Sequence, residues 1–463
     1  MNSTLCYQIF QTFTHRERLK FEKFLASPYL NQREDVRRLF RILNDLGERV
    51  ELLDKKAVFS AMFPGRSYDN LQFNYVLNFL SERMEQFLAC EEMLNDRFQN
   101  RFLRCRAFRK RGLTRPFERN ARELWNDTVE NPLRNAQHWL ETYQLACEGF
   151  ANDMMMGRHS SPHLTQLLQA LERFVTLEHL RWASTGQALS AMSKQETDLG
   201  PYAAMALKIA EGGNDPAALM LQKSYEVLHD PGAEAAFEQL KDLIRSDSGL
   251  FSTTEARDIY MAAINFCIKK HNQGIREYTS EAFVLYREAL EKGLLLENGI
   301  LPKSTYGNIN NLAHLTGASQ WARQFLEQYK MNLSPDVMET VYKYNIAIHH
   351  FRCSEYSKTL ELLRDIEFSE VFVNLDVRKM LARSYFEMGE WQALSSLVES
   401  SKAYLRRLKN TGYHRESYLN LMKFIPKVEK AMRQNKARRL ALVNKIQSTK
   451  YVAEREWLVG KLG

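Results

Sequence analysis

The sequence predicts an all-α protein, a right-handed superhelical α-solenoid of helical hairpins with an N-terminal helical domain. Four aromatic residues recur at a constant spacing of 35 residues, namely Tyr286, Trp321, Tyr356 and Trp391. A fixed period of about 34 to 40 residues is typical of stacked helix pairs, because one pair cannot bury its apolar faces without the next. We expect each aromatic ring to fill the wedge between one pair and the next. The chain has only 20 Gly and 11 Pro in 463 residues, and no β-type alternation persists, which also favours helix.

The first hundred residues contain recognisable helix starts. Thr14 with Glu17 has the spacing of a capping box, and Asn31 with Glu34 repeats it. Asp69 or Asn70 begins a long helix, because a polar residue there precedes a run of apolar residues at helical spacing.

Helices in the middle of the chain are separated by clear breaks. We expect them around 117–128, 132–155 and 162–192, and the Gly- and Asp-containing stretch 211–216 predicts a turn. The repeats begin near Thr253. At 463 residues the chain exceeds the size at which one core stops growing. We therefore expect an N-terminal helical domain (1–115), a middle helical array (116–250), and repeats with basic capping helices (251–463).

The last repeat carries a pattern in which a large residue, a small residue and an aromatic are followed by a turn glycine, then by an aromatic and a small residue. The residues are Leu381, Ala382, Tyr385, Gly389, Trp391 and Ala393. This order resembles the tetratricopeptide repeat, and the resemblance covers about 280–401. The whole chain is also similar to uncharacterised bacterial helical-repeat proteins, from which no activity carries over.

The resemblance to tetratricopeptide repeats implies a concave face, lined by the first helix of each pair, that binds an extended peptide or a partner helix. The residues that it places on this face are Tyr344, Asn345, Ile348, Lys379, Arg383 and Phe386. The paired Lys and Asn clamp with which the family holds a C-terminal carboxylate is absent. The same residues could instead form a solvated surface or contact a neighbouring helix of the chain. We expect a non-enzymatic protein-interaction scaffold.

Sequence signals for an enzyme are missing. No phosphate-binding glycine loop or nucleophile elbow occurs. His159 and His163 are separated by a Ser-Ser-Pro break, and His349 and His350 are adjacent, so neither pair predicts a metal site. The six cysteines are scattered and are expected to be buried thiols without a histidine at ligand spacing. We expect no enzyme activity, no cofactor and no metal.

Two basic segments provide the alternative function of nucleic-acid binding. Residues 97–122 contain ten Lys or Arg against one Glu, and residues 402–450 contain fourteen against two. We expect one helix to carry these arginines up to a break near Pro116. Arginines at helical spacing could contact phosphates, with nearby phenylalanines stacking on bases; they are Arg97, Arg101, Arg104, Arg111 and Arg115. Pairing of this charge with the chain's own acidic residues is the favoured interpretation.

Three further expectations concern partners and location. The basic tail could attach to a membrane surface. A helical period of 35 residues also matches the RNA-binding pentatricopeptide proteins, although no regular polar pair recurs on the inner helices. No apolar run of about 18 residues predicts a transmembrane segment, and no secretion signal is recognisable, so a cytoplasmic location is expected.

Overall fold

Helices account for all regular secondary structure in the computed structural model, which describes residues 4–46, 55–193, 198–246, 249–364, 370–408 and 412–463. Over these residues one isolated antiparallel bridge joins Glu297 to Ile300. The prediction of an all-α chain is confirmed. The helices form two compact units, Met1–Val175 and Thr176–Gly463, and the expected division into three segments stays a prediction.

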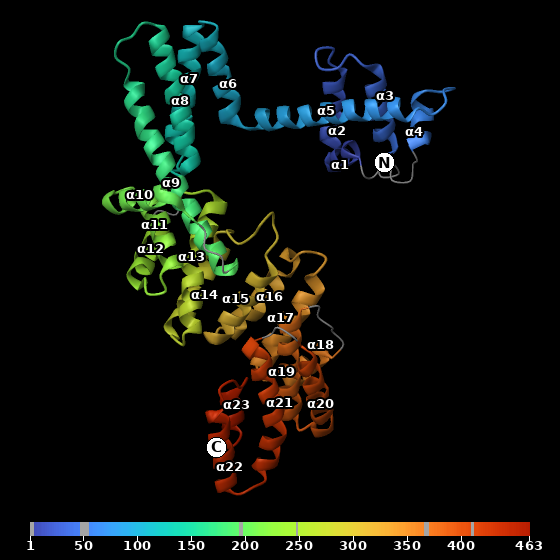
Figure 1. Ribbon diagram of the computed structural model, residues 1–463, viewed down its shortest axis with the longest axis vertical. Helices are drawn as coiled ribbons and strands as arrows, with labels where there is room; N and C mark the ends of the chain where they lie inside the picture. Colours follow the sequence, from blue (N-terminus) through green and yellow to red (C-terminus); the bar gives the residue numbers. More distant parts are fainter. Residues whose placement is uncertain (1–3, 47–54, 194–197, 247–248, 365–369, 409–411) are drawn as a thin grey trace. The chain divides into compact units, whose positions relative to one another are not determined.

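The N-terminal part of the first unit is built around a long helix, α5 (Figure 1). Helices α1, α2 and α3 contact α5, and α4 contacts α3. The bounds are α1 (Leu5–Thr12), α2 (His15–Ala26), α3 (Glu34–Leu46), α4 (Lys55–Met62) and α5 (Asn70–Asn95). Phenylalanine rings are prominent in the core. The ring centroid of Phe21 lies within 5.5 Å of the ring centroids of Phe13, Phe40 and Phe87.

Two of the three predicted helix caps in this part are confirmed. Thr14 and Glu17 form both bonds of a capping box, and the Asp69 carboxylate accepts from two amides in the first turn of α5. The helix predicted to follow Asn31 is present as α3, but Asn31 bonds elsewhere than in a capping box with Glu34: its Oδ1 accepts from the amide of Arg33 and its Nδ2 donates to the carbonyl of Leu25. Asn31 therefore holds the loop before α3.

The remaining helices of the first unit pack against one another through a second, smaller core. Phe98, Phe102, Leu124 and Leu145 form its buried centre. Helices α6, α7 and α8 all contact each other, and the division between the units falls within α9. The bounds are α6 (Arg97–Lys110), α7 (Thr114–Glu130), α8 (Ala136–Met155) and α9 (Pro162–Ser193).

Helices of the second unit contact their neighbours in the chain as a series of pairs (Figure 1). Contacts also join α11 to α13 and α15 to α17, which are the first helices of successive pairs. The bounds are α10 (Gly200–Gly212), α11 (Pro216–His229), α12 (Glu234–Ser246), α13 (Thr253–Asn272), α14 (Glu277–Glu291), α15 (Lys303–Leu315), α16 (Ser319–Gln328), the 3-10 turn η2 (Lys330–Asn332), α17 (Met338–Arg352), α18 (Tyr356–Leu363), α19 (Val371–Met388) and α20 (Trp391–Arg407).

Three further helices follow the last pair and share its core. They are α21 (Gly412–Met432), α22 (Lys436–Ser448) and α23 (Arg455–Gly460). Leu394 and Val398 of α20 are buried in one cluster with Leu421 of α21, Ile446 of α22 and Leu458 of α23. The C-terminal segment therefore covers the end of the series.

The four evenly spaced aromatic residues do not occupy equivalent places. Trp321, Tyr356 and Trp391 lie in the first turn of α16, α18 and α20, whereas Tyr286 is in the middle of α14. Tyr286 is fully buried, but Trp391 keeps 37% of its surface exposed. The expectation that every ring fills a wedge between pairs is therefore wrong for Trp391, because its main aromatic contact is an edge-on one with Phe386.

Among the described ranges, no helix combines the length and the apolar composition needed to cross a membrane.

The burial of each aromatic ring predicts which substitution lowers the free energy of unfolding most. Phe325 is buried and packs on Tyr306, Trp321 and Tyr329. Phe325→Ala should lower the free energy of unfolding by about 3–5 kcal/mol because of the cavity left behind. Trp391→Ala should cost about 1–2 kcal/mol, because a partly exposed ring loses less contact area. Urea unfolding of both variants is the measurement, and an equal or larger loss for Trp391→Ala would contradict the burial argument.

Candidate functional site

The six residues predicted to bind a partner lie on α17 and α19, and three of them are buried. Asn345, Ile348 and Phe386 each keep less than a tenth of their surface exposed. Asn345 faces the preceding pair, where its carbonyl oxygen and Oδ1 accept from Nδ2 of Asn310 at 3.0 and 3.3 Å. These three side chains serve packing between helices.

The two cations among the six are paired with the C-terminal segment. Nη1 of Arg383 lies 2.6 Å from Oε2 of Glu454, in the segment just before α23, and Nζ of Lys379 lies 4.0 Å from Oε1 of the same residue. The Arg383 guanidinium also lies over the rings of Phe351 and Trp457. The charge of this face is thus neutralised within the chain.

A partly buried carboxylate, that of Asp376, joins the same face to α21. Asp376 accepts hydrogen bonds from the hydroxyls of Tyr344, at 3.3 Å, and Tyr418, at 2.8 Å, and lies 2.7 Å from Nζ of Lys379. Burial alone would raise the pKa of Asp376, but the charge of Lys379 and these hydrogen bonds outweigh it, so the pKa lies below its usual value. Asp376 therefore stays ionised and ties three helices together.

Trp457 of α23 completes the cover over α19. Its ring packs edge-on against Phe386 with a centroid separation of 5.1 Å, and its Nε1 donates to Glu387 at 2.6 Å. Lys461 pairs with the other oxygen of Glu387 at 2.7 Å. The structure thus brings Tyr344, Lys379, Arg383 and Phe386 together, and the chain's own C-terminal segment occupies the surface that they form.

An uncovered groove lies farther toward the start of the second unit, between α9, α11 and α13. It has a volume of about 210 Å³. Apolar side chains make up half of its lining, including Leu189 of α9, Leu228 of α11 and Met261 of α13. Arg181 stands on one wall and Asp258 on another. Burial raises the pKa of Asp258, and the neighbouring Arg257, whose Nη2 lies 3.3 Å from it, opposes this effect.

The basic segment 97–122 is divided between two helices. The predicted break near Pro116 lies instead at Gly112, which has a left-handed φ of 69°. Pro116 is accommodated in the first turn of α7, where a missing amide hydrogen costs nothing. Arg104 is on α6 and Arg115 is on α7, so the arginines do not form a stripe on one continuous helix.

Internal partners occupy several groups of this segment. Arg97 and Arg101 both pair with Asp127, at 3.1 and 2.7 Å. Phe98 and Phe102 are buried in the small core, which removes them as platforms for stacking on bases. Arg104, Arg111 and Arg115 are exposed. In the basic tail, residues 409–411 lie outside the described residues.

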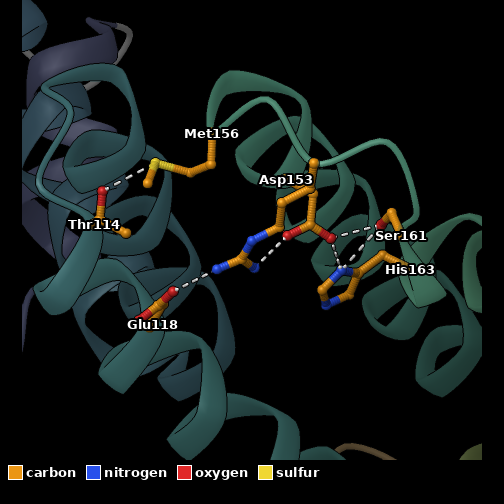
Figure 2. A network of polar contacts seen from close by, with 7 residues as sticks. Thr114, Glu118, Asp153, Met156, Ser161 and His163 are labelled. Carbon is orange, nitrogen blue, oxygen red and sulfur yellow. Dashed lines mark hydrogen bonds and ion pairs between the residues drawn. The ribbon is translucent and has the colours of Figure 1, made fainter.

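A network of polar contacts centres on Asp153 at the end of α8 (Figure 2). Its Oδ2 accepts from the Ser161 hydroxyl at 2.6 Å and from Nδ1 of His163 at 2.8 Å, and its Oδ1 lies 2.8 Å from Nη1 of Arg158. Burial alone would raise the pKa of Asp153, but these partners lower it below its usual value.

The same three residue types occur in nucleophilic hydrolases, but the connections differ here. In a catalytic triad the serine hydroxyl bonds to Nε2 of the histidine. Ser161 instead donates to the carboxylate and lies 3.4 Å from Nδ1 (Figure 2). Its proton is held by Asp153, so the histidine cannot withdraw it. We interpret the network as a tie that fixes the loop between α8 and α9.

A cluster of three potential metal ligands was missed by the sequence analysis. His314, His349 and Cys353 each place a ligand atom within 4.8 Å of the others. Burial lowers the pKa of His314 to about 4 and also lowers that of His349, so both rings are neutral at pH 7. The expectation that no cysteine has a histidine at ligand spacing is wrong, because His349 and Cys353 are four residues apart.

Comparison with known proteins adds no identification. No protein-family model, curated protein or solved structure matches the chain.

Gly149 on α8 provides a test of the packing around the Asp153 network. A Cβ atom at Gly149 would lie 2.6–2.9 Å from the His163 ring. Gly149→Ala should therefore lower the free energy of unfolding by about 1–3 kcal/mol, although alanine is the better helix former. Gly212→Ala is the control, because that position has open space. Chemical unfolding measures both, and a stabilised Gly149→Ala variant would contradict the packing.

Asp376 should make stability depend on pH. Because its pKa is lowered in the folded chain, ionised Asp376 stabilises the fold above the unfolded pKa, and this contribution is lost as pH falls through the folded pKa. Urea unfolding between pH 7 and pH 2 should therefore show a smaller loss of stability for Asp376→Asn than for the unsubstituted protein. Asp198→Asn, on an exposed side chain, is the control. Parallel pH profiles for Asp376→Asn and the unsubstituted protein would exclude this role.

Proposed function

We propose that the chain is a non-enzymatic protein-interaction scaffold whose second unit is a right-handed α-solenoid of the tetratricopeptide type. Contacts within α13 and α14, α15 and α16, α17 and α18, and α19 and α20 support the hairpins. Contacts between the first helices α11 and α13, and α15 and α17, support their stacking. Stacked first helices expose a broad surface without a deep pocket, which suits a polypeptide ligand.

The C-terminal segment illustrates how these helices hold a polypeptide. On α19, cations grip the carboxylate of Glu454, and Phe386 packs against the ring of Trp457. A partner at this position would have to displace the segment. We therefore place the partner in the uncovered groove between α9, α11 and α13, and this open groove is the observation that carries the proposal.

The groove's chemistry suits an amphipathic helix as the partner. Leucine, isoleucine, methionine and alanine side chains make up half of the lining and suit an apolar stripe of the partner, while polar side chains make up the other half. Asp258, whose side chain is 62% exposed on α13, favours a basic residue of the partner through charge complementarity. Arg181 on the α9 wall is already paired with Glu178 at 2.9 Å, so it adds no comparable charge preference for the partner.

Nucleic-acid binding through the basic segments has less support. Burial removes Phe98 and Phe102 as stacking platforms for bases, and Asp127 pairs with two of the five arginines. Arg104, Arg111 and Arg115 are exposed and could still contact the phosphates of a nucleic acid.

Crosslinking from the groove tests the scaffold proposal. A photoreactive amino acid at position 189, where the leucine is 57% exposed, should crosslink a host protein through a segment with apolar residues at helical spacing. Leu189→Glu and Met261→Glu, each introduced separately, should weaken binding of that purified segment at least about tenfold, because a carboxylate would be desolvated against its apolar stripe.

The matched control uses Leu440 on α22, which is 58% exposed and lies outside the groove. The photoreactive group at position 440 should not crosslink the same segment, and Leu440→Glu should leave calorimetric affinity unchanged. Equal weakening by Leu189→Glu and Leu440→Glu, or crosslinks that map to no helical segment, would refute the groove as the binding surface.

A further inference from the structure

Three side chains that transition metals favour meet where two successive hairpins touch. His314 is in the last turn of α15, His349 is in the last turn of α17, and Cys353 caps the C-terminus of α17. The two helices contact each other directly. His314 and His349 are 35 residues apart, the same interval as the aromatic repeat.

The two imidazoles present buried nitrogen atoms without hydrogen-bond partners. They are Nε2 of His314 and Nδ1 of His349. Leaving a buried polar atom unpaired usually costs about 1–3 kcal/mol, so such atoms are uncommon unless an ion, a water molecule or a ligand satisfies them. The other nitrogen of His349, Nε2, lies 4.0 Å from Sγ of Cys353.

A neighbouring hydroxyl orients the His314 ring. Nδ1 of His314 lies 3.0 Å from Oγ of Ser319, the first residue of α16. When Nδ1 carries the proton and donates it to Ser319, the buried Nε2 has a free lone pair that can bind a metal. Metal-binding histidines commonly have such an outer partner, which fixes the ring and raises its basicity.

We propose that His314, His349 and Cys353 bind one Zn²⁺ ion. Imidazole nitrogen and thiolate sulfur are the donors that zinc prefers, and three protein ligands leave a fourth position for water. On binding, the Cys353 thiol loses its proton to solvent and the thiolate coordinates the metal. Unlike the buried Cys6, Cys105 and Cys267, Cys353 is exposed, so the ion can enter from solvent.

The geometry requires only a small adjustment. Donor atoms around a tetrahedral zinc ion lie about 3.3–3.6 Å apart, given metal bonds of about 2.0–2.3 Å. The three ligand atoms lie within 4.8 Å of one another, so the side chains would have to rotate inward by about an ångström or less to reach these separations. The adjacent His350 does not compete, because its Nδ1 is bonded to Glu355.

A bound ion would join two hairpins that are otherwise held by packing and hydrogen bonds. It would stabilise the interface between α15 and α17, because a ligand that binds only the folded chain raises stability with its concentration. This inference does not depend on the partner groove, which lies on α9, α11 and α13.

Cobalt titration of the full-length protein tests the site, with Co²⁺ as the spectroscopic substitute for zinc. We expect one ion per chain and a sulfur-to-cobalt charge-transfer band in the near ultraviolet, which excess Zn²⁺ abolishes. Cys353→Ser should lose the band, and Cys90→Ser, a control in the first unit, should keep it. Absence of the band from the unsubstituted protein, or its persistence in Cys353→Ser, would overturn the proposal.

A conservative variant separates ligand orientation from folding. Ser319→Ala should keep the charge-transfer band but weaken cobalt affinity about 10- to 100-fold, since the outer partner of His314 is lost. Zn²⁺ should also slow alkylation of Cys353 in the unsubstituted protein, a readout that needs no variant. Unchanged alkylation of Cys353 in saturating Zn²⁺ would exclude thiolate coordination.

Discussion

Mutual burial between neighbouring helix pairs is the constraint on which the second unit depends. Ala313 of α15 and Ala347 of α17 have no exposed surface, because small side chains allow adjacent first helices to approach closely. No pair could hide such a surface alone, so each requires the next one in the chain. The last pair has no successor, and α21 to α23 take that place by sharing a core with α19 and α20.

This requirement explains the polar contacts at the C-terminal end. Covering α19 brings its charged side chains under other helices, where an unpaired ion is costly. Glu454 forms an ion pair with Arg383, and Glu387 forms one with Lys461. Asp376 accepts hydrogen bonds from two tyrosine hydroxyls and forms an ion pair with Lys379. These pairs offset the desolvation cost of the charged groups. As a consequence, the C-terminal segment already occupies the surface of α17 and α19 that was expected to bind a partner.

Local signals in the sequence predicted much of the fold but only part of the candidate sites. The Thr14 and Glu17 capping box and the Asp69 cap were predictable, because both ends of each interaction lie within one helical turn. The break at Gly112 was placed at Pro116 instead, since proline in a first turn does not interrupt a helix. Glu454 is 71 residues from Arg383, and no periodicity within α19 indicates it. The His314 and His349 pair was detectable only by applying the 35-residue interval to histidine as well as to the aromatic residues.

The cover provided by α21 to α23 also has a consequence for association between molecules. A series of hairpins that ended at α20 would expose an apolar surface on which another chain could stack. Repeated stacking of this kind would produce a fibre. Leu421, Ile446 and Leu458 pack over that surface, so it is not available for such stacking.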